Sequence, residues 1–371
     1  MPGKHLSSLL VKPAGADCNL DCEYCFFLDR DATVPAPRMA ADVLEAMTRQ
    51  ALAGAGPEMS FCWQGGEPTL MGLDFYREAV ALQRRHAAGR RIENSLQTNG
   101  LLIDDEWAAF LREEDFLVGL SIDGPEAVHD RYRRSRNGAG SWSLVREKAK
   151  LLLDAGVKTN ALVVVNDHSA RFPAEIYGFL KETGLSWMQF IPCVEPDPAD
   201  PARPASYSVS GEAWGRFQCE LFDLWWEDLD GLTPAAEVRG FDAALRHHLG
   251  MPSSLCTHRE TCGDYLVVMH DGGVYPCDFF VSPARRLGNV LEDDLRDLLN
   301  SPAQTAFGRA KADLPPGCLA CEWRPRCHGG CPKDRRVDPV RRLSHLCEGE
   351  RTFFAHADTR LAELAAQMEQ R

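Results

Sequence analysis

Three cysteines near the N-terminus constrain this chain more than any other feature. Cys18, Cys22 and Cys25 lie in the stretch CNLDCEYC, with the spacing C-x3-C-x2-C. Side chains this close in sequence cannot be independent members of a hydrophobic core, because they must share one short segment. The spacing therefore indicates that a common metal ion or metal cluster holds the three thiols together.

The length and composition indicate a large enzyme domain with a smaller one. The chain has 371 residues, of which 44% are apolar, and this length suits roughly two to three average domains. No run of about 20 apolar residues is present to cross a bilayer. The segment before Pro13 is too short and polar for a secretory signal, so we expect a cytoplasmic protein without disulfides.

Charge and cysteine content narrow the function further. The formal net charge is −13, which argues against a nucleic-acid-binding surface. The chain contains fourteen cysteines. In a reducing compartment, so many cysteines favour the binding of metal ions or clusters.

Residues 5 to about 195 alternate between apolar extended runs and helix-like stretches. Such βα units close right-handed into a parallel sheet that curves as a full or partial barrel, with catalytic groups after the carboxyl ends of the strands. We predict strands over residues 6–13, 59–66, 94–100, 116–124, 159–166 and 187–193, and helices over residues 39–53, 73–85, 143–155 and 174–183. The three cysteines follow the first strand, and the stretch QGGEP (64–68) follows the second, so both lie at the same face.

The pattern changes in the second half of the chain. A segment rich in Pro and Asp, residues 194–208, predicts an irregular loop, and residues 214–229 are helix-like. From about residue 250 the chain has short strands, turns and dense cysteine. We therefore predict one domain over residues 1–235 and a second over residues 236–371.

Three thiolates can bind three irons of a four-iron cluster and leave the fourth iron open, whereas structural zinc sites are closed by four protein ligands. The spacing alone also allows a zinc site completed by a distant histidine, or reduced core cysteines. The surrounding residues favour the cluster. The C-x3-C-x2-C motif, with Tyr24 before its last cysteine and Gly65, Gly66 and Glu67 after the next strand, resembles the radical S-adenosylmethionine (radical SAM) superfamily.

This resemblance implies a partial (β/α)6, TIM-like radical SAM barrel with a [4Fe–4S] cluster and S-adenosylmethionine. In that family the open iron binds the amino and carboxylate groups of S-adenosylmethionine, and the Gly65–Glu67 turn meets its methionine end. Glycines let a backbone approach a ligand closely, and a carboxylate accepts a hydrogen bond from an ammonium. Tyr24 would lie near the adenine.

The second half adds eight more cysteines, whose spacing resembles the cysteine-rich SPASM extension of radical SAM enzymes that modify peptides. The resemblance implies two further [4Fe–4S] clusters, for a total of three, each auxiliary cluster being held by four cysteines. The first set would be Cys256, Cys262, Cys277 and Cys331, and the second Cys318, Cys321, Cys327 and Cys347. A pair of zinc ribbons is the alternative. The remaining cysteines, Cys62 and Cys193 in predicted strands and Cys219 in a predicted helix, are expected to be small buried hydrophobes.

Several stretches, including FCWQGGEPTLMGLDF, FLVGLSIDGP and GGVYPCDFF, together resemble the anaerobic sulfatase-maturating enzymes over essentially the whole chain. The N-terminus before Cys18 is also too short for the leader-binding module that other peptide-modifying SPASM enzymes carry. The resemblance implies oxidation of a cysteine or serine in a sulfatase motif, Cys/Ser-x-Pro/Ala-x-Arg, to Cα-formylglycine. It also implies that flavodoxin or ferredoxin supplies electrons.

This reaction requires a base, because the substrate must lose a thiol or hydroxyl proton. Asp278 is the candidate: it follows Cys277 and the hairpin signal DGG, at the position of the family's proposed base. It could instead cap a turn. Gln64 is a candidate contact for substrate or cofactor, and Ser121 and Asp123 could bond the cofactor's carboxylate or ribose. The arginine for that carboxylate is left open among Arg131, Arg133, Arg134, Arg136 and Arg146.

Two other functions fit the sequence. A SPASM enzyme that matures a different peptide would form a thioether or carbon–carbon crosslink. A non-catalytic zinc or iron–sulfur protein that senses redox state would need neither an open iron nor the Gly65–Glu67 turn.

Overall fold

A computed structural model describes residues 3–28, 37–337, 340 and 342–370. Its centre is a ten-stranded sheet with the order β12-β11-β10-β1-β2-β3-β4-β5-β6-β9. The six strands β1 to β6 are parallel, and each pairs with the next along the chain. They are β1 (Leu6–Lys12), β2 (Ala55–Trp63), β3 (Arg91–Thr98), β4 (Leu117–Ser121), β5 (Lys158–Val165) and β6 (Trp187–Pro192).

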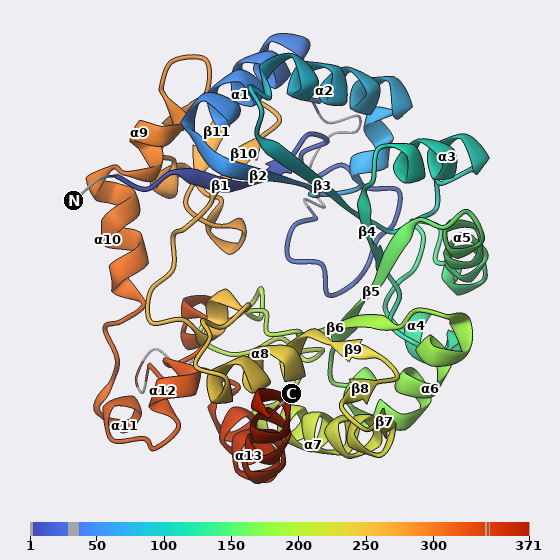
Figure 1. Ribbon diagram of the computed structural model, residues 1–371, viewed down its shortest axis with the longest axis vertical. Coiled ribbons are helices and arrows are strands. Elements are labelled where there is room, and N and C mark those ends of the chain that lie inside the picture. The colour runs from blue at the N-terminus through green and yellow to red at the C-terminus, as the bar shows by residue number, and fades with distance from the viewer. Residues whose placement is uncertain (1–2, 29–36, 338–339, 341, 371) are drawn as a thin grey trace.

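These strands curve as an open arc, with helices on its outer side (Figure 1). The predicted partial barrel is therefore confirmed, and the predicted strands and helices differ from the observed ones only at their ends. The largest shift is in β2, which begins four residues early, at Ala55, because the stretch AGPE gives no strand signal. The connecting helices are α1 (Ala41–Gly54), α2 (Leu73–His86), α3 (Asp105–Glu113), α4 (Glu126–His129), α5 (Trp142–Asp154) and α6 (Pro173–Thr183).

The second half of the chain extends this sheet at both ends. Strand β9 (Glu237–Val238) pairs with β6, and β10 (Leu266–Met269) runs parallel to β1. The hairpin predicted from the DGG signal joins β10 to β11 (Gly273–Tyr275), with Gly272 at φ +77° in its turn. The domain boundary at residue 235 stays a prediction, since the sheet runs across it on both sides.

The rest of the second half is mostly short helices and loops. Its long helices are α7 (Gly211–Glu227), α8 (Arg239–His248) and α13 (Cys347–Glu369), and α13 packs on α7 (Figure 1). The short elements are β7 (Leu229–Asp230), β8 (Thr233–Pro234), β12 (Gly288–Asn289), α9 (Leu295–Leu299), α10 (Pro302–Ala310), α11 (Pro316–Leu319) and α12 (Arg324–Cys327).

Two large apolar cores support the sheet. One lies between β1 to β4 and helices α1 to α3 and includes the fully buried Phe61, Trp63 and Tyr76. The other includes Phe222 of α7 and Phe353 of α13. Each large apolar side chain contributes about 1.5–3 kcal/mol on burial, so these cores hold the carboxyl ends of the strands in a fixed arrangement. Of the helices described, none is long and apolar enough to span a membrane.

Candidate active site

The loop after β1 brings the three N-terminal cysteines into one cavity. Cys18, Cys22 and Cys25 line a cavity of about 250 Å³ at the carboxyl ends of the barrel strands. The backbone fixes the loop, since Asp21 N–H donates to Arg134 O at 2.8 Å and Glu23 N–H donates to Tyr132 O at 3.1 Å. The predicted residues that share this cavity are Tyr24, Gln64, Gly65, Gly66, Glu67, Ser121 and Asp278.

Burial keeps the Cys18 and Cys22 thiols protonated unless a metal binds them. It raises the pKa of Cys18 to about 12 and that of Cys22 to about 11. Iron offsets this cost because it binds the thiolate. Within the described residues, no group of three or more His, Cys, Asp or Glu side chains is close enough to share a single ion. Three converging but separated thiols fit a cluster, in which each thiolate binds a different iron.

The Gly65–Glu67 turn packs directly on the cysteine loop. A Cβ atom on Gly66 would lie 1.9 Å from Asp17 O, and Gly65 has a φ of +136°. Gly66 N–H donates to Gly15 O at 2.8 Å, and Glu67 N–H donates to Asp17 O at 2.7 Å. Glycine is therefore needed here for the close approach of two backbone segments.

The Glu67 carboxylate is fully engaged within the protein. One of its oxygens accepts hydrogen bonds from Thr69 N–H at 3.0 Å, Thr69 Oγ1 at 2.6 Å and Thr98 Oγ1 at 2.7 Å. The other accepts from Asn99 N–H at 2.8 Å. Burial raises the pKa of Glu67, and these hydrogen bonds oppose that shift. Glu67 thus ties the end of β2 to the end of β3, and its contact with the ammonium of S-adenosylmethionine stays a prediction.

Tyr24 belongs to a buried polar network that reaches β4 and β5. Its hydroxyl donates to Asp123 Oδ2 and accepts from Arg133 Nη1 at 3.0 Å. The other Asp123 oxygen accepts from Val164 N–H at 3.0 Å. Burial raises the pKa of Asp123, and the charge of Arg133 opposes that shift. Asp123 thus supports Tyr24 from behind, while Tyr24 and Arg133 line the cavity.

The structure separates the five arginines that the sequence left undistinguished. Arg133 is buried and lines the cavity. Arg131 and Arg134 are exposed, and the half-exposed Arg136 donates to Cys18 O at 2.7 Å. Arg146 lies on α5 against Trp142. No sequence signal identifies Arg133, because only the fold shows which arginine of the run faces inward.

Asp278 lines the same cavity and is paired with a buried lysine. Its Oδ1 is 2.7 Å from Lys12 Nζ, and its Oδ2 is 3.5 Å from Gln64 Nε2. Lys12 is 1% exposed, and its ammonium lies 3.7 Å from the ring centroid of Phe27. Sequence reasoning missed Lys12, although a single charge at the end of the apolar run LLVK was the available signal.

The eight C-terminal cysteines lie in two neighbourhoods, and their division into two ligand sets stays a prediction. Cys256 lies near enough to Cys262 and Cys277 to affect their thiol pKa values, as Cys277 does for Cys331. The Tyr265 hydroxyl also donates to Cys277 Sγ at 3.3 Å. The cysteines of the second set, Cys318, Cys321, Cys327 and Cys347, line one cavity of about 340 Å³.

Comparison with known sequences gives the family. The radical SAM superfamily profile matches residues 13–180, and the iron–sulfur cluster-binding domain called SPASM matches residues 256–322. The chain is 37% identical to the serine-type anaerobic sulfatase-maturating enzyme of Bacteroides thetaiotaomicron, over 94% of this chain and 88% of that protein. It is 38% identical to the cysteine-type enzyme of Clostridium perfringens (strain ATCC 13124), over 96% of this chain and 98% of that one.

The chain belongs to the anaerobic sulfatase-maturating enzymes. It is therefore a radical SAM oxidoreductase with a SPASM domain, and the family's cofactors are iron–sulfur clusters and S-adenosylmethionine.

Solved structures agree with this membership. The native enzyme anSMEcpe with bound AdoMet superposes with a TM-score of 0.89 at 37% identity, covering 97% of this chain and 99% of that one. The same enzyme with bound AdoMet and the Cp18Cys peptide gives the same values. SuiB of Streptococcus suis, at 17% identity and a TM-score of 0.65, shares the fold only.

Cysteines without a proposed ligand role take three different places. Cys62 lies in β2, where its sulfur accepts a weak hydrogen bond from Gln97 Nε2 at 3.8 Å. Cys219 lies in α7 as predicted. Cys193 was predicted within a strand, which is wrong by one residue, because β6 ends at Pro192. It is 5% exposed, packs in the cluster that includes Cys22, and lines the cavity wall.

Proposed function

We propose that this enzyme oxidises a cysteine or serine of a sulfatase polypeptide to Cα-formylglycine in the cavity described above. One observation carries the proposal: the three N-terminal cysteines and Asp278, which are far apart in the sequence, line the same cavity of about 250 Å³. A site where a hydrogen atom and a proton leave the same residue needs both groups within reach of it. The relatives' names and the peptide bound to anSMEcpe support this substrate class.

The cysteines would hold three [4Fe–4S] clusters, in the sets given by the sequence. When bound by Cys18, Cys22 and Cys25, the cluster and S-adenosylmethionine supply the 5′-deoxyadenosyl radical that removes a hydrogen atom from the substrate. The convergence of the three N-terminal cysteines on one cavity, and of the four cysteines of the second set on another, supports these sets. The two auxiliary clusters, with four protein ligands each, leave no iron open to substrate.

Several groups would orient S-adenosylmethionine, directly or through a neighbour. Tyr24, Ser121 and Arg133 line the cavity together with the Gly65–Glu67 turn, and Arg133 offers the cation that a carboxylate needs. Asp123 holds Tyr24 in place and does not itself line the cavity. Glu67 would act through the turn that it stabilises.

Asp278 would serve as the base. After Cβ has lost a hydrogen atom, the substrate sulfur or oxygen must give up a proton as the carbon–heteroatom double bond forms, and one electron would pass to an iron–sulfur cluster of the enzyme. From cysteine this gives a thioaldehyde, which water converts to the aldehyde with release of hydrogen sulfide. The Asp278 oxygen facing Gln64 is the one directed away from Lys12, and it can accept that proton. General base catalysis of this kind contributes about 10²–10⁴-fold. Gln64 would hold both the carboxylate and the peptide.

Two partners complete the proposal. The substrate would be a sulfatase segment with the motif Cys/Ser-x-Pro/Ala-x-Arg, and flavodoxin or ferredoxin would supply electrons. Both come from the family resemblance, and the motif is what an assay should vary first.

The test is anaerobic incubation of reconstituted enzyme, S-adenosylmethionine and reductant with matched peptides carrying cysteine or serine in the motif. We expect the aldehyde mass from at least one peptide, formed together with 5′-deoxyadenosine. Cys18→Ala, the matched control, should form neither product. Formation of 5′-deoxyadenosine with a crosslinked or unchanged peptide would contradict sulfatase maturation while leaving the radical chemistry intact.

A further inference from the structure

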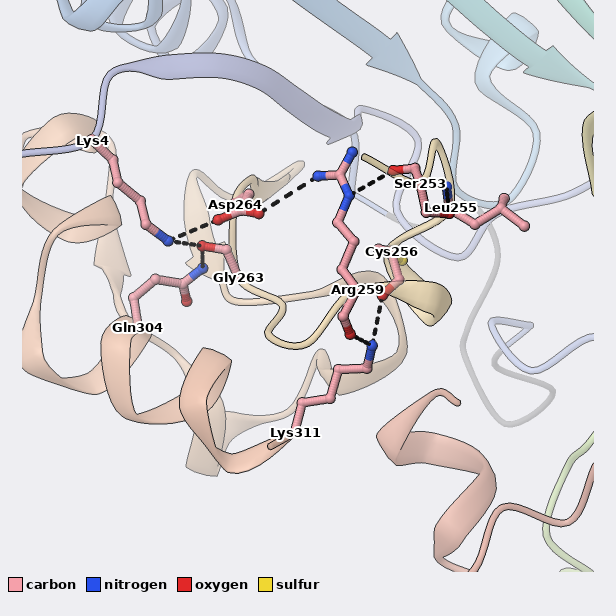
Figure 2. A network of polar contacts seen from close by, with 9 residues as sticks. All are labelled: Lys4, Ser253, Leu255, Cys256, Arg259, Gly263, Asp264, Gln304 and Lys311. Carbon is pink, nitrogen blue, oxygen red and sulfur yellow. Dashed lines mark hydrogen bonds and ion pairs between the residues drawn. The ribbon is translucent and has the colours of Figure 1, made fainter. Parts of the chain in front are cut away.

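Lys311 is a buried cation beside the first auxiliary set of cysteines. It follows α10 and is 0% exposed. Its ammonium donates to Cys256 O at 2.9 Å, to Thr257 O at 2.9 Å and to Arg259 O. Figure 2 shows the lysine reaching across to the turn that carries Cys256. The ammonium thus uses all three of its protons to fix this turn.

This charge has no carboxylate partner in the described part of the chain: its acceptors are carbonyl oxygens. Burying an ammonium costs several kcal/mol unless an anion balances it. Neutral carbonyls satisfy the hydrogen bonds but leave the net charge uncompensated. A neutral side chain would therefore suit the turn better, unless something negative is bound nearby.

Cysteines around Lys311 can supply a negative charge. The Lys311 ammonium interacts electrostatically with Cys256, Cys262 and Cys331, three of the four cysteines in the first set. Four thiolates around a [4Fe–4S] core carry a net negative charge. Such a cluster would place its anion beside the uncompensated cation.

Lys4 provides a contrast in the same view. Its ammonium donates to Gly263 O at 3.5 Å and pairs with Asp264 Oδ1 at 2.8 Å (Figure 2). Its side chain is 53% exposed. Lys4 therefore touches the segment next to Cys262 but is solvated and already neutralised, which makes it a matched control for Lys311.

We propose that Lys311 is the built-in counter-charge of the auxiliary cluster held by Cys256, Cys262, Cys277 and Cys331, fixing the Cys256 turn and raising the reduction potential of that cluster. The proposal rests on the cluster assignment under Proposed function. Net charge and surrounding dipoles set the potential of iron–sulfur clusters. A nearby cation stabilises the reduced, more negative state, so its removal lowers the potential.

The test uses the full-length chain with Cys18, Cys22 and Cys25 replaced by alanine, so that only the auxiliary clusters remain. Iron content and an EPR-monitored redox titration are measured with Lys311 intact and for Lys311→Met, Lys311→Arg and Lys4→Met. In Lys311→Met we expect one of two midpoint potentials to fall and the other to stay. Lys311→Arg and Lys4→Met should match the parent.

Each possible result either supports or overturns the proposed role of Lys311. Two bound clusters with unchanged midpoint potentials in Lys311→Met would overturn this proposal but leave the cluster assignment intact. Lys311→Met could bind iron for only one cluster. In that case, two clusters in Lys311→Arg would support a requirement for the positive charge. One cluster in Lys311→Arg as well would overturn the proposal, because it would show that the site needs the packing of lysine itself. If the chain with Lys311 intact binds too little iron for two clusters, the ligand assignment itself fails, and this proposal falls with it.

Discussion

The three cysteines of the barrel and the eight of the C-terminal region differ in the secondary structure and packing that surround them. The loop from Cys18 to Cys25 lies on six parallel strands and two apolar cores, and buried polar groups such as Glu67 and Asp123 surround it. In the described residues between Lys311 and Cys347, the helical elements are α11, α12 and a 3-10 turn over Pro332–Arg335, each four residues long. One cavity of this region, of about 340 Å³, is lined by the four cysteines of the second set.

This difference indicates which region depends on metal. The barrel can form its site from apolar packing and hydrogen bonds before any iron binds. The C-terminal region has few strands to order its cysteines, so cluster binding would supply part of its folding free energy. The following predictions test this contrast, beginning with the largest effect.

Removal of iron should affect the two regions unequally. After anaerobic chelation, we expect amides between Lys311 and Leu346 to lose most of their protection against hydrogen exchange, while β2 to β5 keep theirs. The physical reason is that the segment loses its clusters and has little core to replace them. Equal loss of protection in both regions, measured by mass spectrometry of exchanged peptides, would contradict the contrast.

Glu67→Gln should destabilise the barrel by about 3 kcal/mol, because a buried carboxylate that accepts four hydrogen bonds would be replaced by an amide that presents its own donors. Urea unfolding followed by tryptophan fluorescence measures the change. Glu58→Gln is the control, since that side chain is 62% exposed, and we expect a change within about 0.5 kcal/mol. A similar small change for Glu67→Gln would refute the anchoring role.

Lys12→Met tests the ion pair that joins the two regions. Lys12 ends β1 of the barrel, whereas Asp278 follows Cys277. Without the lysine, the carboxylate loses its fixed position, and we expect peptide oxidation to fall about 10- to 100-fold while 5′-deoxyadenosine still forms. Lys12→Arg should recover part of the loss. The ratio of aldehyde to 5′-deoxyadenosine is the readout, and an unchanged ratio in Lys12→Met would exclude a positioning role.

The smallest effect concerns His129, which is buried in the barrel between Asp123 N–H at 3.2 Å and Ser141 Oγ at 2.9 Å. Burial lowers the pKa of His129 well below its ordinary value. Its contribution to stability is thus fully present above the unfolded pKa of about 6.5 and is lost as the pH falls toward the folded pKa. Barrel stability should fall by up to about 1.4 kcal/mol per pH unit in that window.

His129→Asn should flatten this pH dependence, whereas His5→Asn, at an exposed position, should not. Urea unfolding between about pH 7.5 and 5.5 compares the slopes. A slope in His129→Asn as steep as in the parent would place the titrating group elsewhere.

Much of the barrel could be predicted from sequence because its strands are continuous apolar runs separated by amphipathic helices. The cysteine sets and Asp278 were also accessible, through spacing and resemblance. Lys12 and Arg133 were not identified. Lys12 is a single charge at the end of an apolar run, and Arg133 is one of five neighbouring arginines. Each is distinguished only by a contact with a residue far away in the sequence.

The extension of the sheet by β10 shows the same limit. The stretch LVVM indicates a strand, but nothing local states that it pairs with β1, from the opposite end of the chain. Likewise, the sequence predicts contact between Glu67 and the cofactor, but it does not predict the hydrogen bonds that the Glu67 carboxylate accepts from Thr69, Thr98 and Asn99. Strand pairing and side-chain burial depend on contacts between distant parts of the chain, so a local stretch of sequence does not reveal them.

The central claim is that the substrate residue loses a hydrogen atom from Cβ near the three N-terminal cysteines and a proton to Asp278, both in the same cavity. The direct test is a substrate peptide deuterated at Cβ, given to the parent enzyme and to Asp278→Asn. We predict deuterium in 5′-deoxyadenosine from both, with peptide oxidation reduced about 10²-fold or more in the variant. Undiminished oxidation by Asp278→Asn, or 5′-deoxyadenosine that carries no deuterium with the parent enzyme, would contradict the account.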